Sequence, residues 1–281
     1  MSDNKHHGLA SPSQAARASE SRKVGLARAL SKLGFCSRSR AAELIRAGRV
    51  RLNGATRRDP EAPVHLERDQ IDVDGNPVEF GVRIYLVLNK PQGLVTTATD
   101  DKGRETIYSL LDKGLPWIGP VGRLDKASEG LLLLTNDTEW AARISDPESH
   151  LSKTYHVQVR GASDEIPIDK LLQGVSADQG LLRAKNARIL RAGEKNTWLE
   201  IVLDEGKNRH IRRMLDALGI EVLRLVRVAI GPLALGSLPK GTFRALTTAE
   251  KGALDRAIAD SREQRGGRAF PRDSSGSEDA R

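Results

Sequence analysis

The chain has 281 residues, of which 38% are hydrophobic, enough for two domains once polar ends are set aside. Its apolar runs, such as residues 84–88 and 131–134, are far too short to cross a membrane, and residues 1–20 lack the apolar core of a signal peptide. The single cysteine, Cys36, excludes an internal disulfide and a multi-cysteine zinc cluster. These features predict a cytoplasmic protein with no membrane span.

The formal net charge of +8 is concentrated in one stretch of the chain. Residues 22–58 contain 11 Lys and Arg but one acid, Glu43, so this stretch carries +10 and the remainder −2. A dense, patterned basic block favours a polyanionic partner such as RNA. The alternative is a merely solubilising surface, which would normally carry more acids among the basic residues.

The first predicted elements lie in this basic block, after a polar segment, residues 1–22, that is expected to be a disordered tail. The leucines of residues 26–33 recur at helical spacing and Gly34 ends that helix, while Ser37 or Ser39 can cap a second helix that Gly48 terminates. Short strands are expected at residues 50–52 and 71–73, each followed by a turn of the Asn-Gly or Asp-Gly type.

Turning these leucines inward leaves basic side chains on the outside, where they can meet phosphates. We expect RNA contacts from Lys32, Arg38, Arg46, Arg49 and Arg51. The stretch LSKLGFCSRSRAAELIRAGRVRLNG resembles the small RNA-binding module first known from ribosomal protein S-four. The resemblance implies an RNA-binding domain over residues 23–81.

From residue 83 onwards the sequence alternates strand-like runs with polar loops. The runs are RIYLVLNKP, GLLLLTND, KTYHVQV, NTWLEIVL, RLVRVAI and TFRAL, with helical segments at residues 138–144 and 209–218. We therefore predict an α+β protein whose second domain, residues 83–260, is built on a mixed, largely antiparallel sheet. Residues 261–281 are expected to be a disordered tail. The sequence contains neither a GxGxxG motif that opens a helix nor a GxxxxGK[ST] motif, so it gives no support to a fold that binds a nucleotide cofactor.

A candidate catalytic acid lies in the segment GRLDKASEG, residues 122–130. Asp125 occupies a glycine-bounded loop just before the apolar run LLLLTND, where a fold can expose a reactive group on a rigid support. From spacing alone, Asp125 could equally cap a turn or pair with Lys126 on the surface.

This segment, GRLDKASEGLLLLTND, resembles the signature loop of the RsuA-type family of ribosomal RNA pseudouridine synthases, whose members commonly carry the same N-terminal module. Three further segments match in order: LNKPQGLVTT, KTYHV and DEGKNRHIRRM. The resemblance implies that Asp125 is the nucleophile and that Tyr155 is the active-site tyrosine, able to stack under an extruded uracil. It also implies that Arg212 is the basic partner of Asp125. Arg123 would bind the substrate, and Lys207 and Arg209 would bind the surrounding RNA.

The last segment can also be interpreted independently as an amphipathic helix. Ile211, Met214, Leu215 and Leu218 form its buried stripe. Arg212 adjoins the stripe and can reach inward, where a guanidinium would keep Asp125 ionised and fix its rotamer. Arg209 and Arg213 could instead be ordinary surface residues that keep the helix soluble or contact phosphates. Tyr155 could instead be an ordinary aromatic residue of the core.

Pseudouridylation is an isomerisation, so it needs no redox cofactor or triphosphate, and no metal-ligand spacing accompanies the histidines. We expect a monomer with no cofactor, acting on ribosomal RNA or ribosomal assembly intermediates. The Asn208-Arg209 pair within EGKNRHIRRM resembles the large-subunit members of this family more than the small-subunit members, and this resemblance favours large-subunit RNA as the substrate. Two other classes are a non-catalytic RNA-binding or ribosome-assembly factor and a base-removing glycosidase, which would release free uracil.

Overall fold

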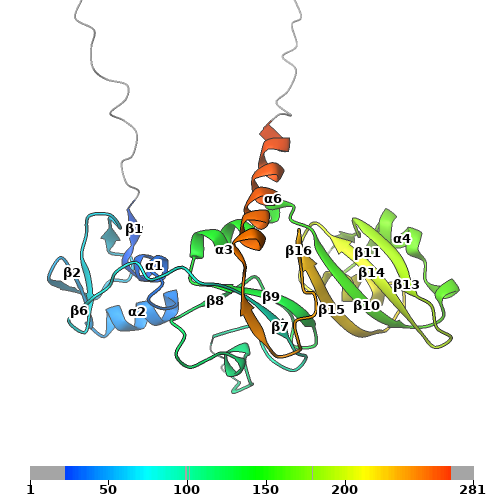
Figure 1. Ribbon diagram of the computed structural model, residues 1–281, viewed down its shortest axis with the longest axis horizontal. Coiled ribbons are helices and arrows are strands. Elements are labelled where there is room, and N and C mark those ends of the chain that lie inside the picture. Colours follow the sequence, from blue (N-terminus) through cyan, green and yellow to red (C-terminus); the bar gives the residue numbers. More distant parts are fainter. Residues whose placement is uncertain (1–22, 99, 101, 179, 267–281) are drawn as a thin grey trace, which may run out of the picture. The chain divides into compact units, whose positions relative to one another are not determined.

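The computed structural model describes residues 23–98, 100, 102–178 and 180–266 (Figure 1). The chain divides into two compact units, Met1–Gly81 and Val82–Arg281. The expected tail of residues 1–22 lies outside the described residues, as do residues 267–281. The expectation of a tail from residue 261 is wrong at its start, because helix α6 (Thr248–Gly266) continues through residues 261–266.

The first unit contains two helices and two small sheets. Helix α1 (Leu26–Lys32) and helix α2 (Arg38–Arg46) pack on a common core with Leu26, Leu30 and Ile45 fully buried. The Ser37 hydroxyl caps α2 by accepting a hydrogen bond from the Arg40 N–H at 3.1 Å. The larger sheet has the order β3-β2-β5-β6, comprising β3 (Ala55–Arg57), β2 (Val50–Leu52), β5 (Ile71–Val73) and β6 (Asn76–Pro77). Strands β1 (Val24–Gly25) and β4 (Pro63–Val64) form the other.

The two predicted turns of this unit are confirmed by their backbone angles. Asn53 and Gly54 have φ of 52° and 79°, and Asp74 and Gly75 have φ of 53° and 81°. Two successive positive φ values define the tight hairpin turn that Asn-Gly and Asp-Gly pairs favour. These turns connect β2 to β3 and β5 to β6.

The second unit is built on a nine-stranded sheet. Its main path runs β13-β14-β10-β15-β9-β7-β17, with β8 (Gly119–Val121) added beside β9 and β16 (Leu233–Ala234) beside β15. The strands of the main path are β13 (Asn186–Arg191), β14 (Asn196–Leu203), β10 (Lys153–Arg160), β15 (Val222–Ile230), β9 (Glu129–Thr135), β7 (Tyr85–Lys90) and β17 (Phe243–Ala245). All neighbours are antiparallel except β9 and β15, so the prediction of a mixed, largely antiparallel sheet is confirmed.

The central strand β9 is buried on both faces, which explains its uninterrupted apolar run. Leu131 and Leu133 pack with helices α3 (Thr138–Ser145) and α6, which lie on one side of the sheet (Figure 1). Leu132 and Leu134 pack on the opposite face with residues of β7 and of the short helix η2 (Ile107–Leu110). A strand covered on both sides needs apolar residues at every position, not at alternate ones.

The remaining elements cover the β10–β14 end of the sheet. Helix α5 (His210–Asp216) places Ile211, Met214 and Leu215 in a third core cluster, as its predicted stripe requires. The sequence interpretation missed helix α4 (Ile168–Gln173), the hairpin of β11 (Val175–Ala177) and β12 (Gly180–Leu182), and strands β8, β13 and β16. Short helices η3 (Pro147–Ser149) and η4 (Ser163–Glu165) complete the unit. Within the described residues, no helix combines the length and the apolar character needed to cross a bilayer.

A single glycine allows the parallel contact between β9 and β15. Gly130 pairs with Arg227 and has a φ of 101°, and a Cβ placed on it would lie 2.3 Å from the Arg227 carbonyl oxygen. We expect Gly130→Ala to lower the free energy of unfolding by about 3 kcal/mol, because the methyl group overpacks the strand contact and the backbone angle is strained. Chemical denaturation of the purified protein measures the change.

Gly180 supplies the matched control for this substitution. Its φ of 104° is nearly the same, but a methyl group added there would have none of the described atoms within 4 Å. Gly180→Ala should therefore show the backbone cost alone, about 1 kcal/mol. Equal losses in the two variants would mean that the close approach of β15 to Gly130 has no energetic importance.

Candidate active site

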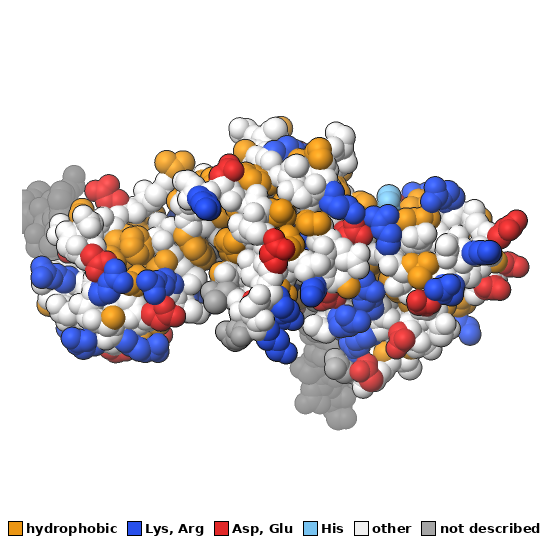
Figure 2. All heavy atoms as spheres, turned by 90° about the horizontal axis from the view of Figure 1, so that it is seen from below, with side chains coloured by type: hydrophobic (Ala, Val, Ile, Leu, Met, Phe, Trp, Pro, Cys, Tyr) orange, Lys and Arg blue, Asp and Glu red, His pale blue; other side chains and the backbone are white. Residues whose placement is uncertain are grey.

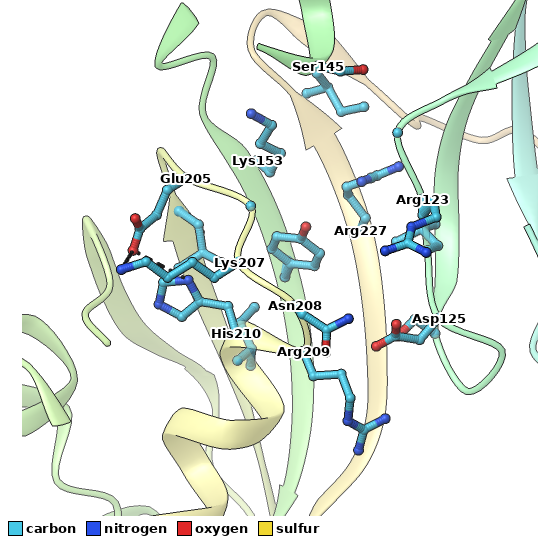
Figure 3. Close-up of a pocket in the computed structure, with 18 of the residues that line it drawn as sticks. Arg123, Asp125, Ser145, Lys153, Glu205, Lys207, Asn208, Arg209, His210 and Arg227 are labelled. Atoms are coloured by element: carbon cyan, nitrogen blue, oxygen red, sulfur yellow. Dashed lines mark ion pairs between the residues drawn. The ribbon is translucent and has the colours of Figure 1, made fainter. Parts of the chain in front are cut away.

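A cavity of about 540 Å³ opens beside strands β10 and β15 in the second unit. One wall is the loop of residues 122–128, here called the catalytic loop, and the opposite wall is the segment of residues 205–211 that leads into α5 (Figure 3). The cavity is large enough for a small ligand. Its lining includes Arg123, Asp125, Lys153, Tyr155, Lys207, Arg209 and Arg227.

The backbone of the catalytic loop is fixed at five successive carbonyl groups. Thr96 Oγ1 donates to the Leu124 carbonyl at 2.7 Å, and the Gly93 N–H donates to that of Lys126 at 2.8 Å. Arg212 Nη2 donates to the Ala127 carbonyl at 3.0 Å. The carbonyls of Asp125 and Ser128 accept from Lys90 Nζ. A loop held by so many donors presents its side chains on a rigid support.

Lys90 is the most buried of these donors. Its side chain has 0% exposure, and Nζ donates to the carbonyl oxygens of Pro91 (3.1 Å), Asp125 (3.2 Å) and Ser128 (2.9 Å). Burial lowers the pKa of Lys90 to about 8, against the opposing effect of the negative charges of Asp125 and Glu129. The ammonium group therefore lies where three carbonyl groups converge, and two of these belong to the catalytic loop.

The lowered pKa of Lys90 predicts a pH effect on stability. Between about pH 8 and 10.5 the unfolded chain still holds the Lys90 proton, whereas the folded chain has released it. Because the unfolded state binds more protons in this window, the Lys90 contribution makes the free energy of unfolding rise with pH there. Denaturation of the wild type and of Lys90→Met at a series of pH values isolates this contribution as the difference between the two slopes. Parallel slopes would contradict the prediction.

Asp125 lies in the cavity wall, half-buried, and points toward the segment that carries Asn208 and Arg209 (Figure 3). Two acids line the cavity. Glu205 pairs with Lys207 at 2.9 Å, whereas Asp125 forms no ion pair with any described residue. The Asp125 carboxylate is thus available to a ligand. Its placement in a pocket differs from the surface turn or Lys126 pair that spacing alone left open.

Arg212 does not make the expected direct ion pair with Asp125 among the described residues. Its Nη2 atom donates to the Ala127 carbonyl, because α5 directs the guanidinium toward the backbone of the catalytic loop. Burial lowers the pKa of Arg212, the charge of Arg209 lowers it further and that of Asp125 opposes the change. Arg212 therefore holds the backbone of the loop beside Asp125 and leaves the carboxylate itself unbonded within the described part of the chain.

Tyr155 lies on β10, opposite Arg227 of β15 and Ile201 of β14. Its ring is partly buried between two of the core clusters and also lines the cavity. Lys153 precedes it by two residues on the same strand, so both side chains project from one face of the sheet. This face forms the floor of the cavity.

The segment leading into α5 places Lys207 and Arg209 on the exposed rim of the cavity. Arg209 has a left-handed backbone, with φ of 47°, at the start of α5. His210 is buried, and burial lowers its pKa, while the charge of Glu205, 3.6 Å away, opposes the change. Within the described residues, no cluster of three or more His, Cys, Asp or Glu side chains is arranged to hold a metal ion.

The sequence interpretation missed three cationic residues of the site: Lys90, Lys153 and Arg227. Each stands in or at the end of an apolar strand run, YLVLNK, KTYHVQV and VLRLVRVAI. A charge within such a run is the available sequence signal, since charged side chains are rarely buried without a purpose. Lys153 and Arg227 meet in the cavity lining, and Lys90 lies buried behind the catalytic loop, because distant strands pair across the sheet.

In the first unit, the predicted RNA-contacting residues lie on its surface. Arg38, Arg46 and Arg51 are exposed, and Figure 2 shows many Lys and Arg side chains on this part of the molecule. Lys32 is half-buried. Arg49 is exposed but donates Nε to Asp74 Oδ1 at 2.8 Å, with a second bond between the same side chains. Its charge is therefore partly neutralised.

Comparisons with known proteins agree with both units. The S4 domain model matches residues 24–71, and the RNA pseudouridylate synthase model matches residues 84–217. The fold and the site thus define an RNA-modifying enzyme with an appended RNA-binding domain.

An RNA pseudouridine synthase of Aquifex aeolicus is 41% identical over 230 residues, 82% of this chain and 92% of its own length. The ribosomal large subunit pseudouridine synthase B of Bacillus subtilis is 37% identical, covering 84% of this chain and 96% of its own. The crystal structure of a pseudouridylate synthase superposes with a TM-score of 0.59 at 30% identity, covering 82% and 99% of the two chains. The chain belongs to the RNA pseudouridine synthase family.

Proposed function

We propose that this enzyme converts a specific uridine of large-subunit ribosomal RNA to pseudouridine, with Asp125 as its nucleophile. The proposal rests on a carboxylate that has no ion pair among the described residues and lies in a cavity wall whose backbone is held at five successive carbonyls. The name of the Bacillus subtilis relative and the Asn208-Arg209 pair support the large subunit as the source of substrate.

The reaction requires the target uridine to leave its helix and enter the cavity. The Tyr155 ring on the cavity floor would stack on the extruded base. Asp125 then either attacks the anomeric carbon or removes a ribose proton, and in both routes the glycosidic bond breaks with its electron pair going to N1. The detached base turns and rejoins the ribose through C5, so the product is an isomer of the substrate.

We assign the remaining candidate residues to RNA binding and positioning. Arg123, on the catalytic loop, would fill the space left by the base or bind a neighbouring phosphate. Arg212 positions the catalytic loop through the Ala127 carbonyl. Phosphate contacts are assigned to Lys207 and Arg209 at the rim, and to Lys32, Arg38, Arg46, Arg49 and Arg51 in the S4 domain.

We further propose a cytoplasmic monomer that acts on ribosomal RNA or on an assembling subunit. Size-exclusion chromatography with light scattering measures the state in solution.

The substrate is tested by incubating the purified protein with transcripts of large-subunit and small-subunit ribosomal RNA. We expect pseudouridine at a defined position in the large-subunit transcript alone. Mapping the modification in ribosomal RNA from cells lacking the protein should show the loss of the same position. Modification of the small-subunit transcript would contradict the choice of subunit, and free uracil as the product would replace the synthase with a glycosidase.

Two substitutions at Tyr155 separate stacking from hydroxyl chemistry. Tyr155→Phe keeps the ring, whereas Tyr155→Leu removes it, which costs about 1–3 kcal/mol of stacking on the base. We expect Tyr155→Leu to lose at least tenfold more activity than Tyr155→Phe, measured as the single-turnover rate of pseudouridine formation. Full activity in both variants would make Tyr155 an ordinary core aromatic.

A further inference from the structure

Two cations flank Tyr155 on the floor of the cavity. Arg227 is 6% exposed and lies opposite Tyr155 across the β10–β15 pair, while the half-buried Lys153 lies two residues before Tyr155. Figure 3 shows Lys153 and Arg227 on neighbouring strands, on the same side of the cavity as Ser145 and away from Asp125. Directly opposite residues in an antiparallel pair have Cβ atoms about 5 Å apart, so Arg227 borders the Tyr155 ring.

The hydrogen bonding of Arg227 is incomplete. Its Nε atom donates to the Leu131 carbonyl at 2.7 Å, which fixes the guanidinium against β9. Its Nη2 atom is buried and has no hydrogen-bond partner among the described residues. A buried donor without a partner is costly, and most buried polar groups in folded proteins are satisfied. The unused donor of Arg227 is therefore a position for a ligand atom.

Neither of the two charges, that of Lys153 and that of Arg227, is paired directly with an acid among the described residues. Burial lowers the pKa of Lys153, and the nearby charge of Arg227 lowers it further, with Asp204 opposing the change. Two like charges held together in a partly buried site favour an anion between or beside them.

The depth of Lys153 and Arg227 in the cavity distinguishes between two possible anions, an RNA phosphate and the extruded base. The phosphates of an RNA strand remain connected to the rest of the chain and meet the exposed cations of the rim, such as Arg123 and Arg209. The deeper pair instead borders the ring on which the extruded base would stack. A base stacked on Tyr155 would bring its carbonyl oxygens O2 and O4 toward Lys153 and Arg227.

We propose that Arg227 and Lys153 stabilise the negative charge on the uracil ring when the glycosidic bond is broken. The inference rests on the proposed function. When the C1′–N1 bond breaks, its electron pair stays on the base and the charge is delocalised onto O2 and O4. The two cations bind that charge while the base turns, until C5 bonds to C1′, the C5 proton leaves and N1 takes up a proton. No other reactant is consumed.

Preorganised donors at a developing negative charge usually contribute a large part of catalysis, and loss of one lowers the rate about 10²–10³-fold. We therefore expect Arg227→Met and Lys153→Met each to reduce the single-turnover rate at saturating RNA by about 10²-fold or more. The dissociation constant for RNA and its salt dependence should change less than twofold. Lys153→Arg, which keeps a cation, should restore a substantial part of the rate.

The matched control is Arg188→Met on the edge strand β13, where Arg188 is exposed and pairs with Glu200 at 2.7 Å. This variant should retain the wild-type rate. Because Arg227 also holds the Leu131 carbonyl, its substitution could unfold the protein, and Lys153→Met then decides the question.

Weaker RNA binding with an unchanged rate at saturation would overturn the proposal and assign the pair to a phosphate. Unchanged rate and unchanged binding in Lys153→Met would overturn it as well. A wild-type protein that forms no pseudouridine in any ribosomal RNA would refute the proposed function and this inference together. An active wild type with fully active variants refutes this inference alone.

Discussion

Asp125→Asn is expected to reduce pseudouridine formation by about 10⁴-fold or more, the scale seen when a covalent nucleophile is removed. The amide has the same shape but neither attacks the anomeric carbon nor accepts a ribose proton effectively. RNA binding should persist, because the substitution leaves every basic residue in place and removes one negative charge. Single-turnover assays and RNA binding measurements on the same protein separate chemistry from recognition.

Asp112→Asn is the control, since Asp112 is an exposed carboxylate of the same unit outside the cavity. It should retain full activity. The Asp125 side chain makes none of the hydrogen bonds that hold the catalytic loop, so Asp125→Asn should lower the unfolding free energy only by the lost attraction to the charges of Lys90 and Arg212. Wild-type rates in Asp125→Asn would leave the protein as an RNA binder with chemistry elsewhere.

The second large effect is expected at Lys90, although this residue never meets the substrate. Lys90→Met leaves the carbonyls of Pro91, Asp125 and Ser128 without their shared donor. The Asp125 carbonyl still accepts a hydrogen bond from the Ser128 N–H at 3.0 Å. Each buried carbonyl left unsatisfied costs about 1–3 kcal/mol, so we expect a loss of roughly 3 kcal/mol in unfolding free energy. The loosened loop should also lower kcat by about 10²-fold, because small misplacements of a catalytic group are costly.

Lys126→Met makes the same change at an exposed position of the same loop. Its stability and kcat should stay near the wild-type values. The decisive comparison is kcat against KM: a positioning role for Lys90 predicts a fall in kcat with little change in KM. A change in KM alone would mean that Lys90 serves RNA binding and not the placement of Asp125.

These two predictions concern the Asp125 side chain and the backbone of the loop that carries it. The Asp125 carboxylate is open to a ligand because it forms no ion pair with a described residue, and the main chain that carries it is held at five successive carbonyl groups. Arg212 contributes to the same support from α5, by its bond to Ala127. A direct ion pair to Asp125 would occupy the carboxylate, whereas a bond to the adjacent carbonyl leaves it open to the ribose.

Local patterns in the sequence determined much of the framework. The leucine spacing and the Asn53-Gly54 turn predicted the first unit, and the apolar runs predicted the principal strands of the second, because helical periodicity, turn angles and strand burial depend on neighbouring residues. The resemblance of GRLDKASEGLLLLTND to the signature loop of the family identified Asp125 as the candidate nucleophile. The short strands and α4 escaped prediction because their apolar residues are too few to set a period.

Only the tertiary structure decided what surrounds the catalytic loop. Lys90 reaches Asp125 across 35 residues of sequence, and Arg227 reaches Leu131 across 96, through pairing of strands that no local pattern specifies. The packing of α5 likewise gives Arg212 a hydrogen bond to the Ala127 carbonyl in place of the expected ion pair with Asp125. The sequence states which side chains are charged, but the burial of each side chain and its hydrogen-bond partner depend on which distant strands lie beside it.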